Sequence, residues 1–327
     1  MTILFAPMEG LTGCIYRRIH HSFFPGVDRY YAPFISPAHD HSEPQRDWRE
    51  LQPENNPGIP LVPQLLTNNA EDFLWAAEVL RDLGCREVNL NLGCPSGTVV
   101  AKRKGSGFLA LPEELDAFLN TVYSSPLASE LRISIKSRIG LKTPEEFHRL
   151  AEIFAQYPIP LLILHPRLRT DQFTGPVRPE AYEEALACCP FPLAWNGDIF
   201  TPEDLTRLRR RFPQMDTVML GRGLAADPAL AARCKGIPGW ESCSREILMA
   251  FHEALCEEYR AVLFGDTALC HRMKEFWSYL IRHFRNGQTY FKRICKAKSY
   301  AEYQLAAHAA LQELELLPNA VWDSALI

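Results

Sequence analysis

Short apolar runs alternate with longer amphipathic stretches over most of this 327-residue chain. Most runs carry Val, Ile and Leu on consecutive positions, which is typical of strands that are buried on both faces. Eight such runs stand out: residues 3–6, 29–34, 61–65, 87–92, 132–136, 161–165, 192–196 and 217–221. They predict eight strands of a parallel sheet.

Helix start signals lie between these runs. Asn69 precedes "AEDFLWAAEVLRDLG", and Gly84 occupies the C-cap position of that stretch. Thr143 and Thr201 each precede a proline at the first helical position and acids in the first turn. Strands alternating with helices over about 235 residues predict a (β/α)8 TIM barrel. A doubly wound sheet would instead need Gly-x-Gly-x-x-Gly after its first strand, and that motif is absent.

The C-terminal part of the chain has a different pattern. Glycine and proline cluster at residues 235–244, and three stretches after them are predicted to be helical, at 245–264, 267–285 and 300–317. We therefore expect a barrel domain at residues 1–237 and a small all-helical bundle domain at 238–327.

Composition narrows the class of protein. Hydrophobic residues at 47% and charged residues at 23% are typical of a soluble globular chain. The N-terminus lacks the pattern of a signal peptide, and no apolar run approaches the ~18 residues of a membrane span. Ten cysteines without Cys-x-x-Cys spacing indicate reduced thiols. We expect a cytoplasmic protein, and a monomer because no long exposed apolar helix suggests a partner.

The distribution of charge along the chain says more about possible partners than the net charge does. The net charge of −4 does not indicate a nucleic-acid-binding protein. Residues 282–298, "RHFRNGQTYFKRICKAK", nevertheless carry six lysines and arginines, no acid and several aromatic rings. This segment is either the solvated face of a helix or a phosphate-contacting surface with stacking aromatics.

Polar residues follow nearly every predicted strand, where (β/α)8 enzymes place their reactive groups. In chain order they are Met8-Glu9, Gln64, Asn91 with Cys94, Lys136 with Arg138, His165 with Arg167, Asn196-Gly197-Asp198 and Gly221-Arg222-Gly223. Barrel interiors are filled mostly by branched apolar side chains. The series therefore predicts an active site.

The last two strand ends predict a phosphate site, because "WNGDIF" and "MLGRGL" offer glycine amides and the guanidinium of Arg222. Lys136 ends a buried strand and needs an anion beside it, either a carboxylate or a ring that becomes anionic, such as a flavin. Gln64 and Asn91 would add hydrogen bonds. His165 is either a phosphate ligand or a core histidine with satisfied hydrogen bonds.

Cys94 follows Gly93 on a tight turn at the barrel mouth, ahead of the basic residues 102–104. Three roles compete for it: nucleophile, metal ligand and general acid. A metal would need neighbouring ligands that the sequence does not offer, so no metal site is expected. A nucleophile would need a base such as His165. A general acid needs only a substrate carbon placed over the flavin.

Seven motifs in this chain resemble, in the same order, those of tRNA-dihydrouridine synthases. They are "APMEG", "PQLL", "NLNLGCPSGTVVAKRKGSGFL", "IKSRIG", "LHPR", "NGDI" and "LGRG". The C-terminal "GDTALCHRMKEFWSYL" is similar to the shorter bacterial members. The chain departs from the family pattern at Gly13, where an aspartate is frequent, and in the basic character of residues 96–107. Neither departure touches the Asn-x-Gly-Cys-Pro element.

The resemblance implies FMN as cofactor and NADPH as its reductant. Hydride would pass to carbon 6 of an extruded uracil in tRNA, and Cys94 would protonate carbon 5. The implied FMN ligands are Pro7, Met8, Glu9, Gln64, Lys136, His165, Asn196, Gly197, Asp198, Gly221 and Arg222. Contacts to the substrate and its RNA backbone are expected from Asn91, Lys102, Arg103, Lys104, Arg138, Arg167, Arg272, Lys274, Arg282, Arg285, Lys292 and Arg293.

Two alternatives stand beside this hypothesis. One is an FMN-dependent reductase of a free pyrimidine or enone, whose helical tail serves oligomerisation. The basic aromatic segment at 282–298 favours RNA over this alternative. The other is an RNA-binding module with vestigial chemistry, which Cys94, Lys136 and the phosphate site argue against. The sequence does not name the uridine that is reduced.

Overall fold

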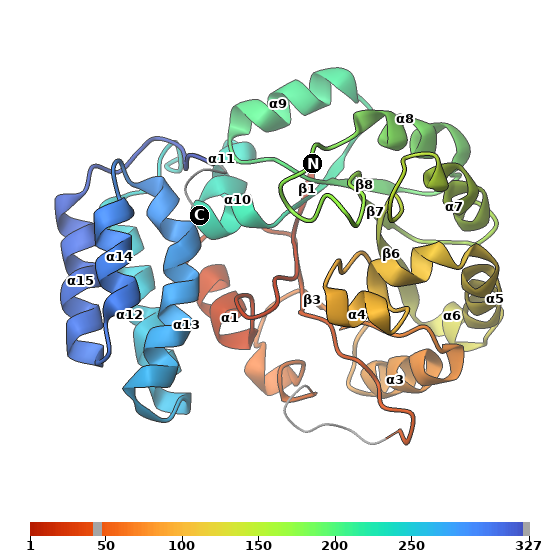
Figure 1. The fold of residues 1–327 in the computed structure, drawn as a ribbon, viewed down its shortest axis with the longest axis horizontal. Coiled ribbons are helices and arrows are strands. Elements are labelled where there is room, and N and C mark those ends of the chain that lie inside the picture. The colour runs from red at the N-terminus through yellow and green to blue at the C-terminus, as the bar shows by residue number, and fades with distance from the viewer. Residues whose placement is uncertain (42–47, 323–327) are drawn as a thin grey trace.

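The computed structural model describes residues 1–41 and 48–322. Its centre is a barrel of parallel strands surrounded by helices, and a group of helices stands beside the barrel (Figure 1). Within the described ranges, no helix has the length and apolar character needed to cross a membrane.

The strands confirm the predicted (β/α)8 barrel. All strand pairs are parallel, in the order β3-β2-β1-β9-β8-β7-β6-β5-β4. β3 and β4 are two halves of the one predicted run 61–65, separated at Pro63, which has no N–H to donate to the ladder. β3 pairs with β2 and β4 with β5, so the barrel closes through this run. The strands are β1 (Thr2–Phe5), β2 (Arg29–Tyr31), β3 (Leu61–Val62), β4 (Gln64–Leu65), β5 (Glu87–Leu92), β6 (Arg132–Arg138), β7 (Leu162–His165), β8 (Leu193–Asn196) and β9 (Thr217–Leu220).

Helices cover the outside of the barrel, and several begin at the predicted caps. The Asn69 side chain accepts the Asp72 N–H at the start of α3, and Thr201 forms a reciprocal capping box with Asp204 at α9. The barrel part contains α1 (Cys14–Phe23), η1 (Pro53–Asn55), α3 (Ala70–Asp82), α4 (Gly97–Ala101), η2 (Gly105–Ala110), α5 (Pro112–Tyr123), α6 (Leu127–Glu130), α7 (Glu146–Phe154), α8 (Pro179–Cys188), α9 (Pro202–Arg211), α10 (Arg222–Ala226) and α11 (Leu230–Cys234).

One helix start differs from the prediction. α7 begins at Glu146 and not directly after Thr143. The Glu146 carboxylate turns back and accepts the backbone N–H groups of Leu141, Lys142 and Thr143. A turn thus precedes the helix.

The barrel interior has two unlike halves. One half is a small apolar cluster of side chains in or next to β1, β2, β3, β7, β8 and β9. Its members are Leu4, Ala6, Tyr31, Val62, Leu161, Ile163, Ala194 and Met219. The other half, on β4, β5 and β6, is polar and buried: Gln64, Glu87, Asn89, Asn91 and Ser134. Parallel register places Asn89 beside both Gln64 and Ser134. Polar groups buried in this way require hydrogen-bond partners.

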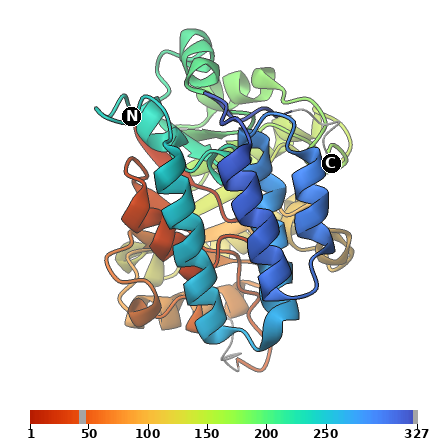
Figure 2. The ribbon, with the colours of Figure 1, turned by 90° about the vertical axis from the view of Figure 1, so that its left-hand side faces the viewer.

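The C-terminal helices are α12 (Arg245–Val262), α13 (Gly265–Leu280), η3 (Ile281–His283), α14 (Gln288–Lys296) and α15 (Tyr300–Glu313), and Figure 2 shows the long ones side by side. Phe251 of α12 packs against Tyr16 of α1, with ring centroids 5.9 Å apart. It also packs against Phe24, at 5.0 Å. One cluster of buried apolar side chains therefore continues from the barrel helices into this region. The division at residues 237 and 238 stays a prediction.

The basic segment 282–298 is not one helix. Its first residues end η3, a turn with Asn286 at φ 55° follows, and only Gln288–Lys296 form α14. The sequence prediction of a single helix over 267–285 therefore extended too far, because α13 ends at Leu280.

Candidate functional site

Asn91 shapes the turn that carries Cys94. Its side-chain oxygen accepts the backbone N–H groups of Gly93 and Cys94, both at 2.9 Å. Its amide nitrogen donates to Gln64 Oε1 at 2.7 Å, and Gln64 Nε2 donates to Asn89 Oδ1 at 2.7 Å. These three buried amides hold one another, so the cysteine turn is anchored to the strands beneath it.

The hydrogen-bond chain continues down the barrel. Asn89 Nδ2 donates to Ser134 Oγ at 3.0 Å, and Ser134 Oγ donates to Glu87 Oε1 at 2.8 Å. Arg29 donates to the other Glu87 oxygen at 2.8 Å. These lower residues were not predicted, because they lie below the strand ends at which reactive groups are expected. The signal was present in "EVNLNL", whose polar residues recur at every second position and so share one face of the strand.

Two short helical segments follow Cys94, and the basic residues 102–104 lie in the turn between them. α4 follows at Gly97–Ala101 and η2 at Gly105–Ala110. The Ser106 hydroxyl and backbone N–H both donate to the Cys94 carbonyl, at 2.8 and 3.1 Å. Gly105 adopts φ +56°, and a Cβ there would lie 3.0 Å from the Cys94 Cβ. Glycine is needed at this position, and the cysteine is clamped from both sides along the chain.

The Cys94 thiol is half-buried, and its environment keeps it protonated. Burial raises the pKa of Cys94, although the Ser96 N–H and the charges of Lys136 and Arg138 lower it. No group of three metal-ligating side chains lies around it or anywhere else in the described parts of the chain. A protonated thiol is a poor nucleophile and a poor metal ligand, but it can donate a proton.

Arg138 ties the cysteine turn to the loop after β7. Its guanidinium donates to three backbone carbonyls: Gly93 at 2.9 Å, Leu168 at 2.8 Å and Gln172 at 2.7 Å. It also lies 5.4 Å from the Phe173 ring centroid. The side chain is buried, so its role in this structure is to join two loops of the barrel mouth.

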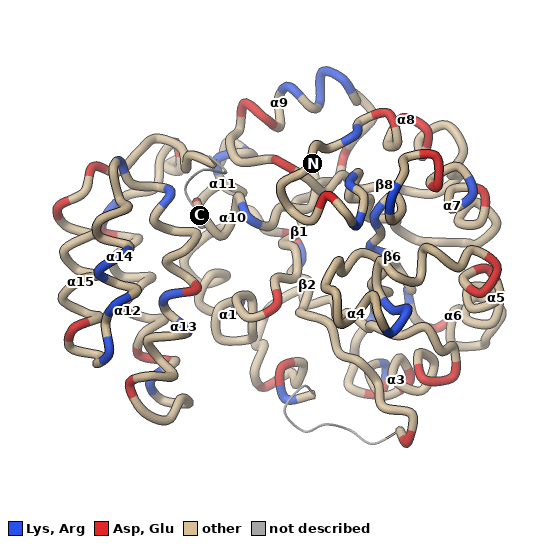
Figure 3. The backbone as a smooth tube through the Cα atoms, viewed as in Figure 1, with Lys and Arg blue, Asp and Glu red and all other residues tan. Residues whose placement is uncertain are grey.

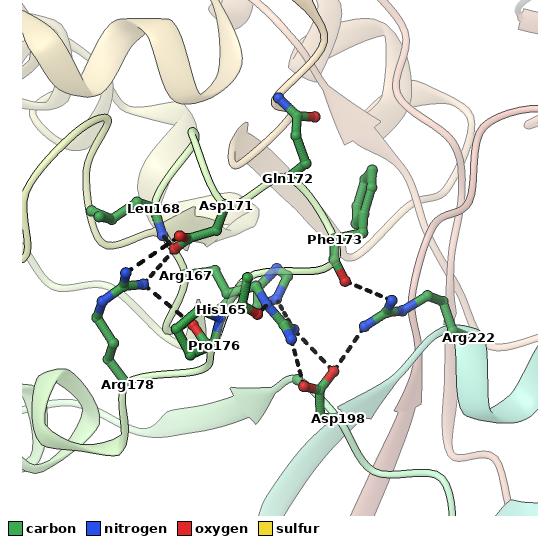
Figure 4. Close-up of polar contacts among 12 residues, drawn as sticks. His165, Arg167, Leu168, Asp171, Gln172, Phe173, Pro176, Arg178, Asp198 and Arg222 are labelled. Carbon is green, nitrogen blue, oxygen red and sulfur yellow. Dashed lines mark hydrogen bonds and ion pairs between the residues drawn. The ribbon is translucent and has the colours of Figure 1, made fainter. Parts of the chain in front are cut away.

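Arg167 and Arg222 meet at Asp198, as Figure 4 shows. Arg167 donates two hydrogen bonds to Asp198, at 2.9 and 2.5 Å, and Arg222 donates one to the same carboxylate at 2.7 Å. Arg222 also donates to the Phe173 carbonyl at 2.7 Å. Two strand ends predicted to share a site, those of β8 and β9, are thereby joined to the loop after β7.

His165 lies inside this cluster of cations as a neutral ring. Burial, followed by the charges of Arg138, Lys136 and Arg167, lowers the pKa of His165 well below its usual value. Arg167 approaches its Nε2 at 3.2 Å, and an arginine can only donate, so the ring proton belongs on Nδ1. Burial and Arg138 also lower the pKa of Lys136, to about 7. Such a cluster favours an anionic ligand that would restore the charge of Lys136.

The glycines at the ends of β8 and β9 are packed closely against neighbouring side chains. A Cβ on Gly197, at φ +155°, would lie 3.0 Å from Val177 and 3.5 Å from His165. A Cβ on Gly221 would lie 3.3 Å from Ala6 and 3.8 Å from the Met8 sulfur. A side chain at either position would press against these neighbours, and the cations Arg167 and Arg222 lie beside these strand ends through their contacts with Asp198. This donor set fits a phosphorylated cofactor such as FMN.

The remaining predicted cofactor residues line the same end of the barrel. Asn196 donates to the Met219 carbonyl at 2.8 Å, which fixes its amide between β8 and β9. Pro7 and Met8 are half-buried directly after β1, the Met8 N–H donates to Thr12 Oγ1 at 2.8 Å, and Glu9 is exposed. β1 lies beside β9 in the barrel, so these residues adjoin the phosphate site.

The basic side chains predicted to contact RNA fall into two groups. The first lies beside the barrel mouth after α4, where Lys102 and Arg103 are exposed and Lys104 is half-buried. Figure 3 shows this basic group next to α4. Arg103 lies 3.9 Å from the carboxylate of Glu114. Lys102 and Arg103 therefore face solvent beside the mouth.

The second group lies on the C-terminal helices and is less uniform. Lys292 and Arg293 are exposed on α14, whereas Arg285 forms an exposed ion pair with Glu315 at 2.6 Å. Lys274 donates to the Ala297 carbonyl at 2.8 Å, and Arg272 lies 5.6 Å from the Tyr259 ring. Arg282 is buried and lies 4.0 Å from the ring of Trp322. Some of these cations are therefore exposed, whereas others are engaged in contacts within the helical region.

Comparison with protein families and curated proteins identifies relatives. The model of the family described as Dihydrouridine synthase (Dus) matches residues 4–325. A Pseudomonas putida protein named tRNA-dihydrouridine(16) synthase is 30% identical over 236 residues, which are 70% of this chain and 72% of that protein. A Neisseria meningitidis protein of the same name is 25% identical over 328 residues, 96% of both chains.

Solved structures show likeness in fold. Histamine dehydrogenase from Rhizobium sp. 4-9 superposes with a TM-score of 0.54 at 11% identity, covering 77% of this chain and 48% of that one. The old yellow enzyme homologue from Zymomonas mobilis gives a TM-score of 0.50 at 11% identity, over 76% of this chain and 94% of that one. At these identities the likeness concerns the barrel alone.

Proposed function

We propose that this chain, which belongs to the dihydrouridine synthase family, uses FMN and NADPH to reduce uridine 16 of transfer RNA to 5,6-dihydrouridine. The observation that carries the proposal is Cys94, a half-buried thiol with a raised pKa on an anchored turn beside a cationic barrel mouth. The choice of position 16 is supported by the names of the curated relatives.

The FMN phosphate would bind Arg222 and the backbone amides at Gly197 and Gly221, beside His165 and Asn196. Lys136 and the residues after β1 (Pro7, Met8 and Glu9) would contact the ring, Gln64 would support the ring site through its hydrogen bonds to Asn89 and Asn91, and Asp198 would orient Arg222. When bound, FMN supplies a hydride for carbon 6 of uracil and is replenished by NADPH. Because Lys136 has a pKa of about 7, an anionic group beside it would keep it charged.

Cys94 would donate the proton that carbon 5 of uracil requires. The C5–C6 double bond then gains one hydride and one proton, while NADPH is oxidised to NADP+. Burial holds the proton on sulfur until the substrate arrives. The Ser96 N–H, Lys136 and Arg138 would stabilise the thiolate that remains after the transfer.

The uracil must leave its stack in the RNA to reach this thiol. Lys102, Arg103 and Lys104 stand beside the mouth, where they would hold the phosphates on either side of the extruded nucleotide. The exposed Lys292 and Arg293 of α14 would bind the RNA backbone farther from the reacting base. Arg272, Lys274 and Arg285 would add weaker contacts in the same region.

The test is an anaerobic reaction followed by the absorbance of the flavin. The purified protein is reduced with NADPH, and unmodified transfer RNA is then added. We expect rapid reoxidation by this RNA and none by free uridine. A flavin that is reoxidised by small enones but not by RNA would support a small-molecule reductase instead, and a chain that binds no flavin would refute both functions.

The position is tested with matched RNA substrates. A transfer RNA in which cytidine replaces uridine 16 should leave the flavin reduced, whereas replacement of another uridine in the same loop should not. Mass spectrometry of the digested product then locates the dihydrouridine. Reoxidation by the cytidine-16 RNA at the full rate would overturn position 16 and leave the reductase function standing.

A further inference from the structure

The chain after α15 returns from the helical region to the barrel. Val321 N–H donates to the Arg282 carbonyl at 2.9 Å, and Asn319 accepts from Arg233 of α11 at 2.7 Å. Figure 1 shows this dark-blue segment crossing toward α10 and α11. It delivers Trp322 to Phe200, which follows β8, with the two rings 4.9 Å apart and 6° from parallel. A residue far along the sequence is thus placed at the phosphate end of the barrel.

Trp322 contacts Arg222 there. The Arg222 guanidinium carbon lies 4.7 Å from the Trp322 ring centroid and 5.5 Å from that of Phe200. The edge of the same guanidinium is held by Asp198 and by the Phe173 carbonyl. Arg222 is therefore fixed in two ways, by hydrogen bonds in its plane and by aromatic rings against it.

The aromatic contacts can hold the plane of the Arg222 guanidinium while its hydrogen bonds are exchanged. Asp198 also binds Arg167 and carries a negative charge, so an arriving phosphate competes with it for Arg222. Once one of these hydrogen bonds is exchanged, the guanidinium can rotate unless something else fixes its plane. A stacked indole fixes the plane of a guanidinium without using any of its N–H donors.

Arg282 stabilises the indole from the helical side. Its guanidinium carbon lies 4.0 Å from the Trp322 ring, and its backbone carbonyl accepts the Val321 N–H. Tyr279 of α13 lies nearly parallel to the same indole, at 6.3 Å and 24°. Residues of the barrel and of the helical region therefore meet on one side chain.

We propose that Trp322 is a positioning residue that holds Arg222 in the orientation that binds the FMN phosphate. The inference rests on the proposed function, because it takes Arg222 as a phosphate ligand. It assigns Arg282 to the support of the indole, which is a different role from the RNA contact expected from the sequence. It also makes cofactor retention depend on a segment that follows the last helix.

The test uses the full chain stripped of flavin and titrated separately with FMN and with riboflavin, which lacks the phosphate. Trp322→Leu keeps an apolar side chain without a π face, and Trp322→Phe keeps the π face. We expect Trp322→Leu to weaken FMN binding about tenfold and riboflavin binding hardly at all. Trp322→Phe should stay close to the wild-type chain in both titrations.

Arg222→Ala and Trp240→Leu are the matched controls. Arg222→Ala should lose the preference for FMN over riboflavin more completely than Trp322→Leu. Trp240 packs on Phe24 at 5.8 Å, away from the phosphate site, so Trp240→Leu should leave the preference unchanged. The thermal unfolding midpoint of each variant shows whether the chain is still folded.

The outcomes separate this inference from the function beneath it. An unchanged FMN preference in Trp322→Leu, with a reduced one in Arg222→Ala, would overturn the inference alone. An equal loss of FMN and riboflavin in Trp322→Leu would also overturn it, because a general structural role would produce that result. A wild-type chain without affinity for FMN would refute the proposed function, and the inference with it.

Discussion

The basic side chains of the barrel mouth and those of α14 differ in what surrounds them. Arg138 and Arg167 are buried, and every direction of their guanidinium groups meets a carbonyl, a carboxylate or a ring. Lys292 and Arg293 are exposed, and the nearest ring to Arg293, that of Tyr290, lies 5.7 Å away.

This difference indicates two kinds of anion recognition. A buried and fixed cation presents its charge at one point, which suits a phosphate or a ring that must be placed to within a fraction of an ångström. An exposed and mobile cation follows a flexible polyanion and acts mostly through counterion release. Substitutions in the mouth should therefore change chemistry or folding strongly, and substitutions on α14 should change RNA affinity weakly.

The largest effect is expected at Cys94, which lies beside the buried cations of the barrel mouth. Cys94→Ala should lower turnover on transfer RNA by roughly 10²–10⁴-fold, the usual contribution of a general acid. Reduction of the flavin by NADPH should stay at the wild-type rate, because the thiol has no part in that step. Stopped-flow absorbance measures both half-reactions separately.

Cys295→Ala is the control, because Cys295 is an exposed thiol on α14. It should behave like the wild-type chain in both half-reactions. If Cys94→Ala retained its turnover, the thiol would not be the general acid, and another group at the barrel mouth would have to donate the proton.

The next largest effect is expected on stability. Arg138→Met should lower the free energy of unfolding by roughly 2–4 kcal/mol, because it leaves three backbone carbonyls without their donor. Arg285→Met removes an exposed ion pair with Glu315 and should cost about 0.5 kcal/mol or less, since water screens that pair. Urea unfolding of the two flavin-free variants gives both values. Equal losses would mean that burial does not distinguish the two sets of cations.

Arg138 also shows which part of the site could be predicted from the sequence and which part could not. Its position at a strand end was predictable, as were Cys94, Lys136 and Arg222, because polar groups at the ends of apolar strands stand out. Its partners were not, because the Leu168 and Gln172 carbonyls come from a loop about 30 residues away, whose path depends on tertiary packing. The sequence identified the charged residues, and the fold determines which groups each of them contacts.

The same division holds for the fold. The eight buried strands and the caps at Asn69 and Thr201 followed from local rules. α14 was not predicted, because residues 282–298 were interpreted by their charge, although Tyr290, Phe291 and Ile294 recur at helical spacing and pack into the core. The stacking of Trp322 on Phe200 joins residues about 120 apart, which no local pattern predicts.

The next prediction concerns Lys136 and the dependence of the free energy of unfolding on pH. Its pKa falls to about 7 in the folded chain, so between pH 7 and about 10 the unfolded chain binds more protons. This group therefore makes stability rise with pH across that range. Lys136→Met should stabilise the flavin-free chain at pH 6, on the order of 1–2 kcal/mol, with a gap that narrows by pH 9. Urea unfolding at both pH values measures it.

The same substitution should act in the opposite direction on function. Without the ammonium group, Lys136→Met should bind FMN more weakly, while the chain itself is more stable. A variant that is less stable than the wild type at pH 6 would show that Lys136 has a compensating anion within the protein, and the flavin would then not be needed to explain its burial.

The smallest effect is expected on α14. Reversing both charges, with Lys292→Glu and Arg293→Glu, should weaken transfer RNA binding several-fold and reduce the dependence of log K on log salt by about two. The matched control reverses Arg209 and Arg210, which are also exposed but lie on α9 on the outside of the barrel (Figure 3). Filter binding at several salt concentrations compares the pairs. If both lower affinity equally, the loss reflects net charge alone and α14 has no particular role in binding RNA; a loss confined to the α14 pair would place the polyanion along that helix, since only position then distinguishes the variants.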